Sequence, residues 1–298
     1  NSEPDACGVC GGDGEDIECW DGSFVCEESV CPDETVDLSI EMGSGWNWFS
    51  VNVEGDDMSP NAVLATLEPE LNDLIKDQND FAVYYGEEYG WSGGLTAIDA
   101  TSLYKLNISS DGALAFTGFP ADPLTTPISL GIGWNWIGYL PQGILNVNDA
   151  LGTVAADLND LIKNQNDFAI YYGEEYGWSG GLADMMPGRG YMLNVSYESD
   201  LIYPNGSSMV RMITPLEEEK VLPSTIGEWA VNPRDYEFNA TMTISIDSHE
   251  DFDGDFVGVF VDDQCRGIAE RMEFVIDGSY NYSIIVYSNV VDGEKLSF

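Results

Sequence analysis

Two short acidic segments carry the oxygen ligands that a hard cation prefers. One cluster of carboxylates lies among glycines near the N-terminus, and the other alternates around Gly254. Clustered carboxylates on a tight loop are typical of Ca²⁺ sites, although the second segment is no EF-hand, because its sixth residue is Phe256. The alternative interpretation is that both segments are solvated acidic turns. The candidate calcium ligands are Asp13, Glu15, Asp16, Asp251, Asp253 and Asp255.

Five of the six cysteines lie in the first 31 residues, with the spacing C-x2-C-x8-C-x6-C-x4-C. A zinc site usually pairs two such knuckles or adds histidines, and the chain has a single histidine, His249. We therefore expect at least two disulfides in a secreted chain, since so short an acidic segment buries too little surface alone. The cysteine left over forms a bond to Cys265, stays free or has a partner upstream. The candidate disulfide residues are Cys7, Cys10, Cys19, Cys26, Cys31 and Cys265.

The sequence lacks the arrangements that carry common catalysis. His249, which would have to be the base of a Ser/His/Asp site, lies in the polar segment DSHEDFDGD, and no G-x-S-x-G motif occurs. No phosphate-binding loop or dinucleotide fingerprint is present. Among 53 acidic residues no pair stands out as the two carboxylates of a glycoside hydrolase. We therefore expect no catalytic residues and a protein that is not an enzyme.

Two aromatic turns with the sequence GEEYGWSGG are the best candidates for ligand binding. Flat aromatic side chains beside carboxylates can stack on sugar faces while the carboxylates bind hydroxyl groups. The alternative is that both tryptophans fill the core and the glycines make the turn. The candidate glycan-binding residues are Tyr89, Trp91, Tyr176 and Trp178. Weaker candidates are the N-glycosylation sequons at Asn107, Asn194, Asn205, Asn239 and Asn281.

The elements that carry these turns are duplicated. Leu71–Leu95 and Leu158–Leu182 match at 23 of 25 positions with an offset of 87 residues, and the tetrapeptide GWNW at 45–48 recurs at 133–136. A period of this length predicts two copies of one folded unit.

Each copy has the same predicted order of elements. A strand through GWNW (Ser44–Val53, Ile132–Leu140) precedes a short helix that begins at Ser59-Pro60 in one copy and at Asn148/Asp149 in the other. A second short helix is predicted at Leu71–Gln78 and Leu158–Gln165, because leucine and isoleucine share one face. Then come a strand, the aromatic turn and a closing strand. The predicted strands are Phe81–Tyr85 and Phe168–Tyr172, and the closing ones run through Tyr104 and Tyr191.

Beyond residue 213 the pattern changes to short strands separated by Asp/Gly turns, which is typical of a β-sandwich. These strands are predicted at Thr241–Ile246, Phe256–Val261, Gly267–Phe274 and Tyr280–Tyr287. The predicted fold class is mainly β with short helices. Its units are a disulfide-rich segment (1–35), two tandem homologous modules (36–124 and 125–213) and a sandwich module (214–298).

The net charge of −43, from 53 acidic and ten basic residues, excludes a nucleic-acid-binding surface and argues against docking on anionic lipid. Hydrophobic residues make up 44% of the chain, so an acidic but folded protein is expected rather than disorder. Self-repulsion at this charge favours saline, alkaline or divalent-rich surroundings, where it is screened. No apolar run approaches the ~18 residues that span a membrane.

Three segments resemble parts of multi-module secreted bacterial surface proteins. They are ACGVCGGDGE at 6–15, the GWNW…YYG…W…GGL units, and DFVGVFVDDQCRGIAE with YNYSIIVYSNVVDGEKLSF at 255–270 and 280–298. The resemblance implies an exported, non-catalytic structural or adhesive protein at the cell surface or outside the cell. The last strand, Lys295–Phe298, leaves an open sheet edge, so we expect head-to-tail self-assembly into a filament. The alternative is a module that binds polysaccharide through the aromatic turns.

Overall fold

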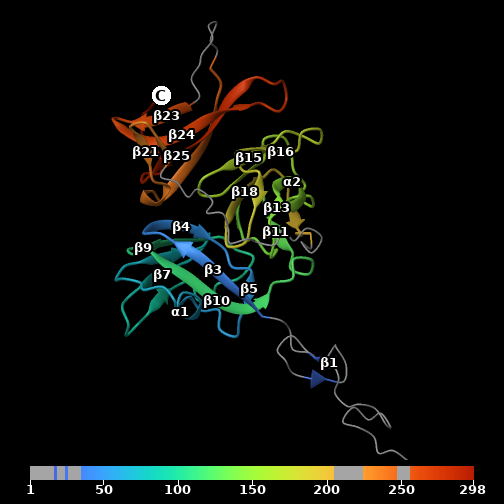
Figure 1. Cartoon of the computed structure of the whole chain (residues 1–298), viewed down its shortest axis with the longest axis vertical. Coiled ribbons are helices and arrows are strands. Elements are labelled where there is room, and N and C mark those ends of the chain that lie inside the picture. Colours follow the sequence, from blue (N-terminus) through green and yellow to red (C-terminus); the bar gives the residue numbers. More distant parts are fainter. Residues whose placement is uncertain (1–16, 19–23, 26–34, 205–223, 247–255) are drawn as a thin grey trace, which may run out of the picture.

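The computed structural model describes residues 17–18, 24–25, 35–204, 224–246 and 256–298 (Figure 1). The regular elements of this part of the chain are antiparallel strands with two short α-helices and one 3₁₀ helix, and the mainly β fold class is confirmed. Near the N-terminus the two-residue strands β1 (Ile17–Glu18) and β2 (Phe24–Val25) pair with each other.

Each of the two repeats holds a five-stranded antiparallel sheet with the same strand order. In repeat 1 (residues 36–124) the order is β4–β9–β6–β7–β8, and in repeat 2 (residues 125–204) it is β12–β18–β14–β15–β16. Corresponding strands therefore have corresponding neighbours, which confirms the duplication. The strands in repeat 1 are β4 (Gly45–Phe49), β6 (Leu74–Lys76), β7 (Phe81–Tyr84), β8 (Trp91–Gly93) and β9 (Tyr104–Ile108). Those in repeat 2 are β12 (Gly133–Ile137), β14 (Leu161–Lys163), β15 (Phe168–Tyr171), β16 (Trp178–Gly180) and β18 (Tyr191–Val195).

Smaller sheets complete the core of each repeat. In repeat 1 they form the order β3–β10–β5, and in repeat 2 the pairs β11–β19 and β13–β17. The strands are β3 (Val36–Met42), β5 (Val53–Glu54), β10 (Gly112–Pro120), β11 (Ile128–Leu130), β13 (Leu145–Asn146), β17 (Asp184–Met185) and β19 (Ser199–Leu201). Each repeat has its own cluster of buried side chains. The cluster of repeat 1 lies around Ile75 and Leu106, and that of repeat 2 lies around Ile162 and Leu193.

The first predicted helix of each repeat is present but short. Helix α1 (Pro60–Val63) begins where expected, because the Ser59 side chain accepts a hydrogen bond from the Ala62 N–H and Pro60 occupies the first turn. In repeat 2, α2 (Val147–Ala150) begins two residues before the predicted start, because Asn146 is the capping residue.

The second predicted helix, at Leu71–Gln78 and Leu158–Gln165, is wrong. Asn72 and Asn159 adopt the left-handed conformation, with φ of 75° and 70°, which a helix does not tolerate. Only three residues of each segment are regular, and they form the central strands β6 and β14. Eight residues with one apolar face do not distinguish a helix from a turn followed by a buried strand.

The C-terminal module (residues 224–298) contains one five-stranded sheet, in the order β22–β25–β24–β23–β26, and a hairpin of β20 with β21. The first part of β24 pairs with β23 and its last three residues pair with β25, so the expected sandwich takes the form of one sheet bent at β24. The elements are β20 (Ser224–Ile226), β21 (Trp229–Val231), the 3₁₀ helix η3 (Pro233–Asp235), β22 (Phe238–Ile244), β23 (Phe256–Val261), β24 (Gln264–Glu273), β25 (Tyr280–Ser288) and β26 (Leu296–Ser297).

The two faces of this sheet bury different sets of side chains. Ile284 on β25 and Val259 on β23 point into the core of the module itself. Ile285 and Tyr287, on the opposite face of β25, pack with Phe168 of repeat 2. The C-terminal module therefore lies on the outer face of the repeat 2 sheet, above β4 of repeat 1 (Figure 1).

Candidate functional site

The outer face of each repeat sheet combines tryptophan and lysine. Because side chains alternate along a strand, the register places Trp48, Lys105, Lys76 and Phe81 in one row across β4, β9, β6 and β7. The corresponding row in repeat 2 is Trp136, Met192, Lys163 and Phe168. The opposite face of each sheet points into the core.

A glutamine side chain of each repeat forms hydrogen bonds with the GWNW strand of the other repeat. Gln165 of repeat 2 accepts from the Trp48 N–H at 3.1 Å and donates to the Trp46 carbonyl at 2.8 Å. Gln78 of repeat 1 makes the same pair of bonds to Trp136 and Trp134, both at 2.9 Å. Each GWNW strand lies at the edge of its sheet, so the exchanged amide satisfies backbone groups that would otherwise need water. The repeats are thus related by an approximate two-fold axis.

Three of the five lysines of the chain lie against these tryptophans. The Lys105 Nζ is 3.9 Å from the ring centre of Trp48 and 4.6 Å from that of Trp136, so it joins the two repeats. Lys76 and Lys163 lie over Trp46 and Trp134, at 4.8 and 4.9 Å. A cation over an indole face is attracted by its quadrupole, most strongly where water is excluded.

Burial controls the protonation of two of these amines. It lowers the pKa of Lys105 to about 7, and the neighbouring charges of Lys76 and Lys163 act in the same direction, while Glu237 opposes them. Burial lowers the pKa of Lys163 to about 8. The centre of this acidic protein therefore contains amines that change charge between neutral and mildly alkaline pH.

The C-terminal module binds both lysines that flank the centre. The Lys76 Nζ lies 2.5 Å from a Glu237 carboxylate oxygen, and the Lys163 Nζ donates to the Asn239 side chain at 2.7 Å. The Tyr287 hydroxyl donates to the Gln165 carbonyl at 3.0 Å. The start of β22 therefore lies between the two repeats and contacts each of them.

A second attachment joins η3 to the edge strand of repeat 1. The Arg234 Nε donates to Asn47 Oδ1 at 3.1 Å. A Cβ on Gly45, whose φ is 93°, would lie 2.4 Å from the Arg234 carbonyl oxygen, so this close approach requires glycine. Gly43 packs in the same way against the Arg234 guanidinium.

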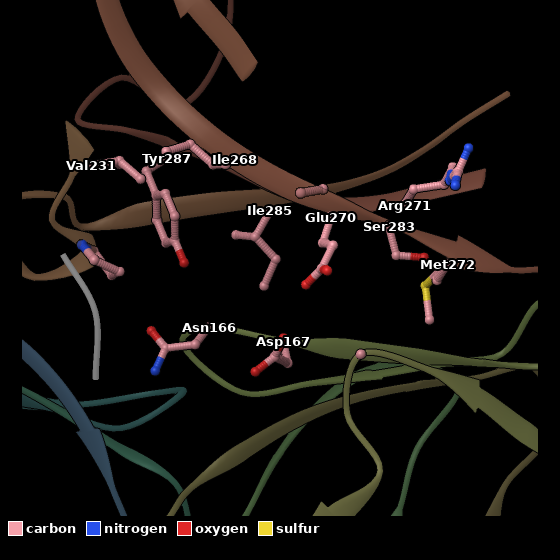
Figure 2. Close-up of a pocket in the computed structure, with 13 residues that line it drawn as sticks. Asn166, Asp167, Val231, Ile268, Glu270, Arg271, Met272, Ser283, Ile285 and Tyr287 are labelled. Carbon is pink, nitrogen blue, oxygen red and sulfur yellow. The ribbon is translucent and has the colours of Figure 1, made fainter. Parts of the chain in front are cut away.

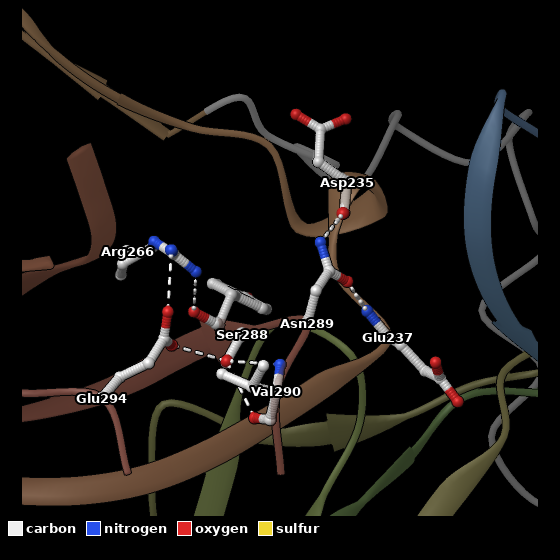
Figure 3. A network of polar contacts seen from close by, with 8 residues as sticks. Asp235, Glu237, Arg266, Ser288, Asn289, Val290 and Glu294 are labelled. Carbon is white, nitrogen blue, oxygen red and sulfur yellow. Dashed lines mark hydrogen bonds and ion pairs between the residues drawn. The ribbon is translucent and has the colours of Figure 1, made fainter. Parts of the chain in front are cut away.

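A polar network behind β22 holds Glu237 and the loop at 288–294 in place (Figure 3). The Asn289 side chain accepts from the Glu237 N–H and donates to the Asp235 carbonyl, both at 2.9 Å. Arg266 donates to Glu294 at 3.0 Å, and the other carboxylate oxygen of Glu294 accepts from the Ser288 hydroxyl. The loop is therefore fixed from both sides.

A cleft of about 330 Å³ separates the C-terminal sheet from the β14–β15 turn of repeat 2. Asp167 and Glu270 point into it from opposite walls, and Val231, Ile268 and Tyr287 lie at its apolar end (Figure 2). This cleft is a gap left beside the contact between the module and repeat 2.

The aromatic turns, predicted as glycan-binding, divide into buried and exposed residues. Trp91 and Trp178 are buried and pack on Tyr84 and Tyr171, so the core interpretation is correct for both and their ring faces are not available to a sugar. Tyr89 is exposed and Tyr176 is half-buried.

An asparagine on the short helix holds each buried tryptophan. The Asn148 side chain accepts from the Trp178 N–H at 2.7 Å and donates to its carbonyl at 3.0 Å, and Asn61 does the same for Trp91. Sequence reasoning missed this role, although the same residue type stands at the same place of both copies.

The sequons differ in accessibility. Asn107 and Asn194 are half-buried in β9 and β18, Asn239 is bound to Lys163, and Asn281 is buried. Asn205 lies outside the described residues, which end that stretch at residue 204.

The calcium ligands proposed from the sequence, His249 and the five N-terminal cysteines all lie outside the described residues. Within the described ranges, no three His, Cys, Asp or Glu side chains gather as a metal site.

Cys265 is a free, buried thiol, and burial raises its pKa. In the same ranges the structure contains no apolar helix of the length that a lipid bilayer requires.

The glutamine exchange and the lysine cluster were also missed by sequence reasoning. A signal was present, because Gln78, Lys76 and their counterparts Gln165 and Lys163 recur in both repeats. Lysines are scarce in this chain, so three of them on sheet strands indicated a structural role.

No protein-family model, curated protein or solved structure matches the chain.

Proposed function

We propose that this protein is a non-catalytic structural protein of the cell surface or extracellular space, a subunit that assembles head to tail into a filament or matrix. Saline or alkaline surroundings are part of the proposal, because a net charge of −43 needs screening. The acidic surface limits non-specific association, so assembly requires particular contacts.

One observation carries this proposal: the C-terminal module covers the Phe168 end of the outer sheet face of repeat 2 and leaves the equivalent Phe81 end of repeat 1 exposed. Phe168 of repeat 2 is 2% exposed beneath the C-terminal module, whereas Phe81, at the same position of repeat 1, is 56% exposed. An exposed apolar patch of this kind is typical of an interaction surface.

A test is the size of the purified full chain in concentrated salt. We expect long polymers in sedimentation and ordered filaments in electron micrographs. A chain that remains monomeric at high concentration in its native brine contradicts self-assembly.

The second candidate is a polysaccharide-binding adhesin module. Three exposed aromatic residues near one hairpin favour it, namely Phe81, Tyr85 and Tyr89. A glycan array tests it: binding that is lost in Tyr85→Ala and Tyr89→Ala variants supports the adhesin function, and no binding to any glycan contradicts it.

A further inference from the structure

Because an approximate two-fold axis relates the two repeats, the surface on which the C-terminal module docks occurs a second time in the chain. The occupied surface consists of the outer face of repeat 2 around Phe168 and the edge strand of repeat 1 at Gly45. The two-fold relationship places the second surface on the outer face of repeat 1 around Phe81 and on the edge strand of repeat 2 at Gly133. We call the residues Phe81, Tyr85, Ile132, Gly133 and Trp134 the vacant surface.

Except at Ile132, whose counterpart is Ser44, the vacant surface has the same side chains as the occupied one but lacks its contacts with the C-terminal module. Trp46 is 7% exposed and its counterpart Trp134 is 40% exposed. A Cβ on Gly45 would meet Arg234, whereas a Cβ on Gly133 would meet nothing within 4 Å.

The same contrast holds for the tyrosines. Tyr172 packs on Phe274 with ring centres 5.2 Å apart, and its counterpart Tyr85 is exposed. The two repeats are nearly identical here, so repeat 1 leaves exposed the residue types that contact the C-terminal module in repeat 2.

The two parts of the vacant surface are adjacent. The Gln78 side chain, three residues before Phe81, donates to the Trp134 carbonyl at 2.9 Å and accepts from the Trp136 N–H. The β6–β7 turn of repeat 1 therefore lies directly beside the open edge of β12, and the exposed rings belong to one patch.

A second module cannot dock there in the same pose. The start of β22 lies on the axis, where Glu237 binds Lys76 and Asn239 binds Lys163, so an equivalent strand would overlap it. A partner must use a different face. Parts of the C-terminal module remain free for this, since its contacts with the repeats use the face with Ile285 and Tyr287, η3 and the start of β22.

The loop that follows β25 is one such part, and it is apolar and exposed. Val291 is 82% exposed beside the half-exposed Val290, next to a shallow apolar hollow of about 170 Å³ that includes Met242 and Leu296. The Ser288 hydroxyl oxygen accepts from the Val290 N–H at 2.9 Å and lies 2.9 Å from the Val290 carbonyl oxygen, so the loop has a defined shape (Figure 3).

We infer that the vacant surface receives the C-terminal module of a second copy of this chain, through the Val290–Val291 loop. This rests on the proposed function and names the two unlike surfaces that meet. Because the surfaces differ, the contact does not close on itself in a pair, and each added copy leaves one surface of each kind free. The contact therefore propagates unless its rotation closes a ring.

The test uses two full-chain variants and their mixture. Phe81→Glu places a charge on the vacant surface and leaves the loop intact, whereas Val291→Glu does the reverse. We expect polymers from the wild type, monomers from each variant alone, and one-to-one dimers from the equimolar mixture, measured by sedimentation velocity. Both residues are exposed, and unchanged melting temperatures confirm that the variants fold.

Leu158→Glu, which changes an exposed leucine of repeat 2, is the matched control and should polymerise as the wild type does. If Phe81→Glu also polymerises, the inferred contact is wrong while self-assembly stands. If the wild type itself is monomeric, the proposed function fails as well. If Phe81→Glu leaves association unchanged but abolishes retention on cellulose or chitin beads, the surface binds polysaccharide and the inference is overturned.

Discussion

The Nζ atom of Lys105 lies 3.9 Å from the centre of the Trp48 indole ring, and Lys105 is only 5% exposed. The ring attracts the ammonium form, but removal from water penalises that form more strongly, and the pKa of Lys105 falls to about 7. Protonation of this amine as the pH decreases therefore destabilises the folded protein, although the attraction of the ring offsets part of that cost.

The free energy of unfolding should rise between pH 7 and pH 10. In this range the unfolded chain holds protons on lysines whose ordinary pKa is 10.5, while the folded chain has released them from Lys105 and later Lys163. We expect a gain on the order of 1–3 kcal/mol. Above about pH 10 stability should fall again, because burial raises the pKa of Tyr104, Tyr139 and Tyr287 and the unfolded chain then ionises first. Urea denaturation at a series of pH values measures this, and a decline from pH 7 to pH 9 contradicts it.

Lys105→Met should flatten that pH dependence. Methionine is the natural residue at the corresponding position of repeat 2, Met192, so the substitution fits the same packing. We expect the rise in unfolding free energy between pH 7 and pH 10 to shrink by about 1–2 kcal/mol. Lys295→Met, at an exposed lysine, is the control and should leave the slope unchanged. An unaltered slope in Lys105→Met would show that another group titrates.

Much of the fold could be predicted from the sequence because it is encoded locally. The repeats follow from 23 identities in 25 positions. Strand β23 has the predicted bounds, Phe256–Val261, because its apolar run is flanked by sequence rich in Asp. The short helix at Pro60 follows from its cap. By contrast, only Leu74–Lys76 of the segment Leu71–Gln78 form a strand, which pairs with the adjacent β7 and with the distant β9. The pairing with β9 leaves no local signal in the sequence.

The candidate site was less predictable for the same reason. Whether Trp91 faces solvent or the core depends on Asn61, which lies 30 residues away and brackets it with two hydrogen bonds. The contrast between Phe81 and Phe168 has no local cause at all, since their flanking sequences are nearly identical and only the C-terminal module distinguishes them.

Gln165→Ala should destabilise the protein more than Gln78→Ala. Both remove two hydrogen bonds to a GWNW strand, but those of Gln165 lie partly buried beneath the C-terminal module, whereas Gln78 is exposed and water can replace its bonds. We expect a loss of about 2 kcal/mol for Gln165→Ala and below about 1 kcal/mol for Gln78→Ala. Equilibrium denaturation measures both, and equal losses would mean that the module does not shield this contact.

Stability should increase with salt concentration. The 43 excess negative charges repel one another, and the screening length falls from about 10 Å at 0.1 M salt to about 3 Å at 1 M. We expect the melting temperature to rise over this range, even though salt also weakens the Lys76–Glu237 pair. Melts with and without a calcium chelator at fixed ionic strength separate screening from cation binding. Melting temperatures that do not change with salt contradict the expected self-repulsion.

The coupling between Asn148 and Gly177 should appear as a non-additive pair of substitutions. Asn148→Ala removes both bonds to Trp178 and should cost about 2 kcal/mol. Gly177 has φ of 64°, and a Cβ there would lie 2.3 Å from the Asn148 Oδ1, so Gly177→Ala both strains the backbone and displaces the asparagine. Once Asn148 is alanine, only the backbone strain of about 1 kcal/mol remains. The double variant should therefore be more stable than the sum of the single losses predicts, as measured by urea denaturation. Asn61→Ala with Gly90→Ala provides the matched pair in repeat 1, and additive losses in both repeats would show that the asparagine does not hold the turn.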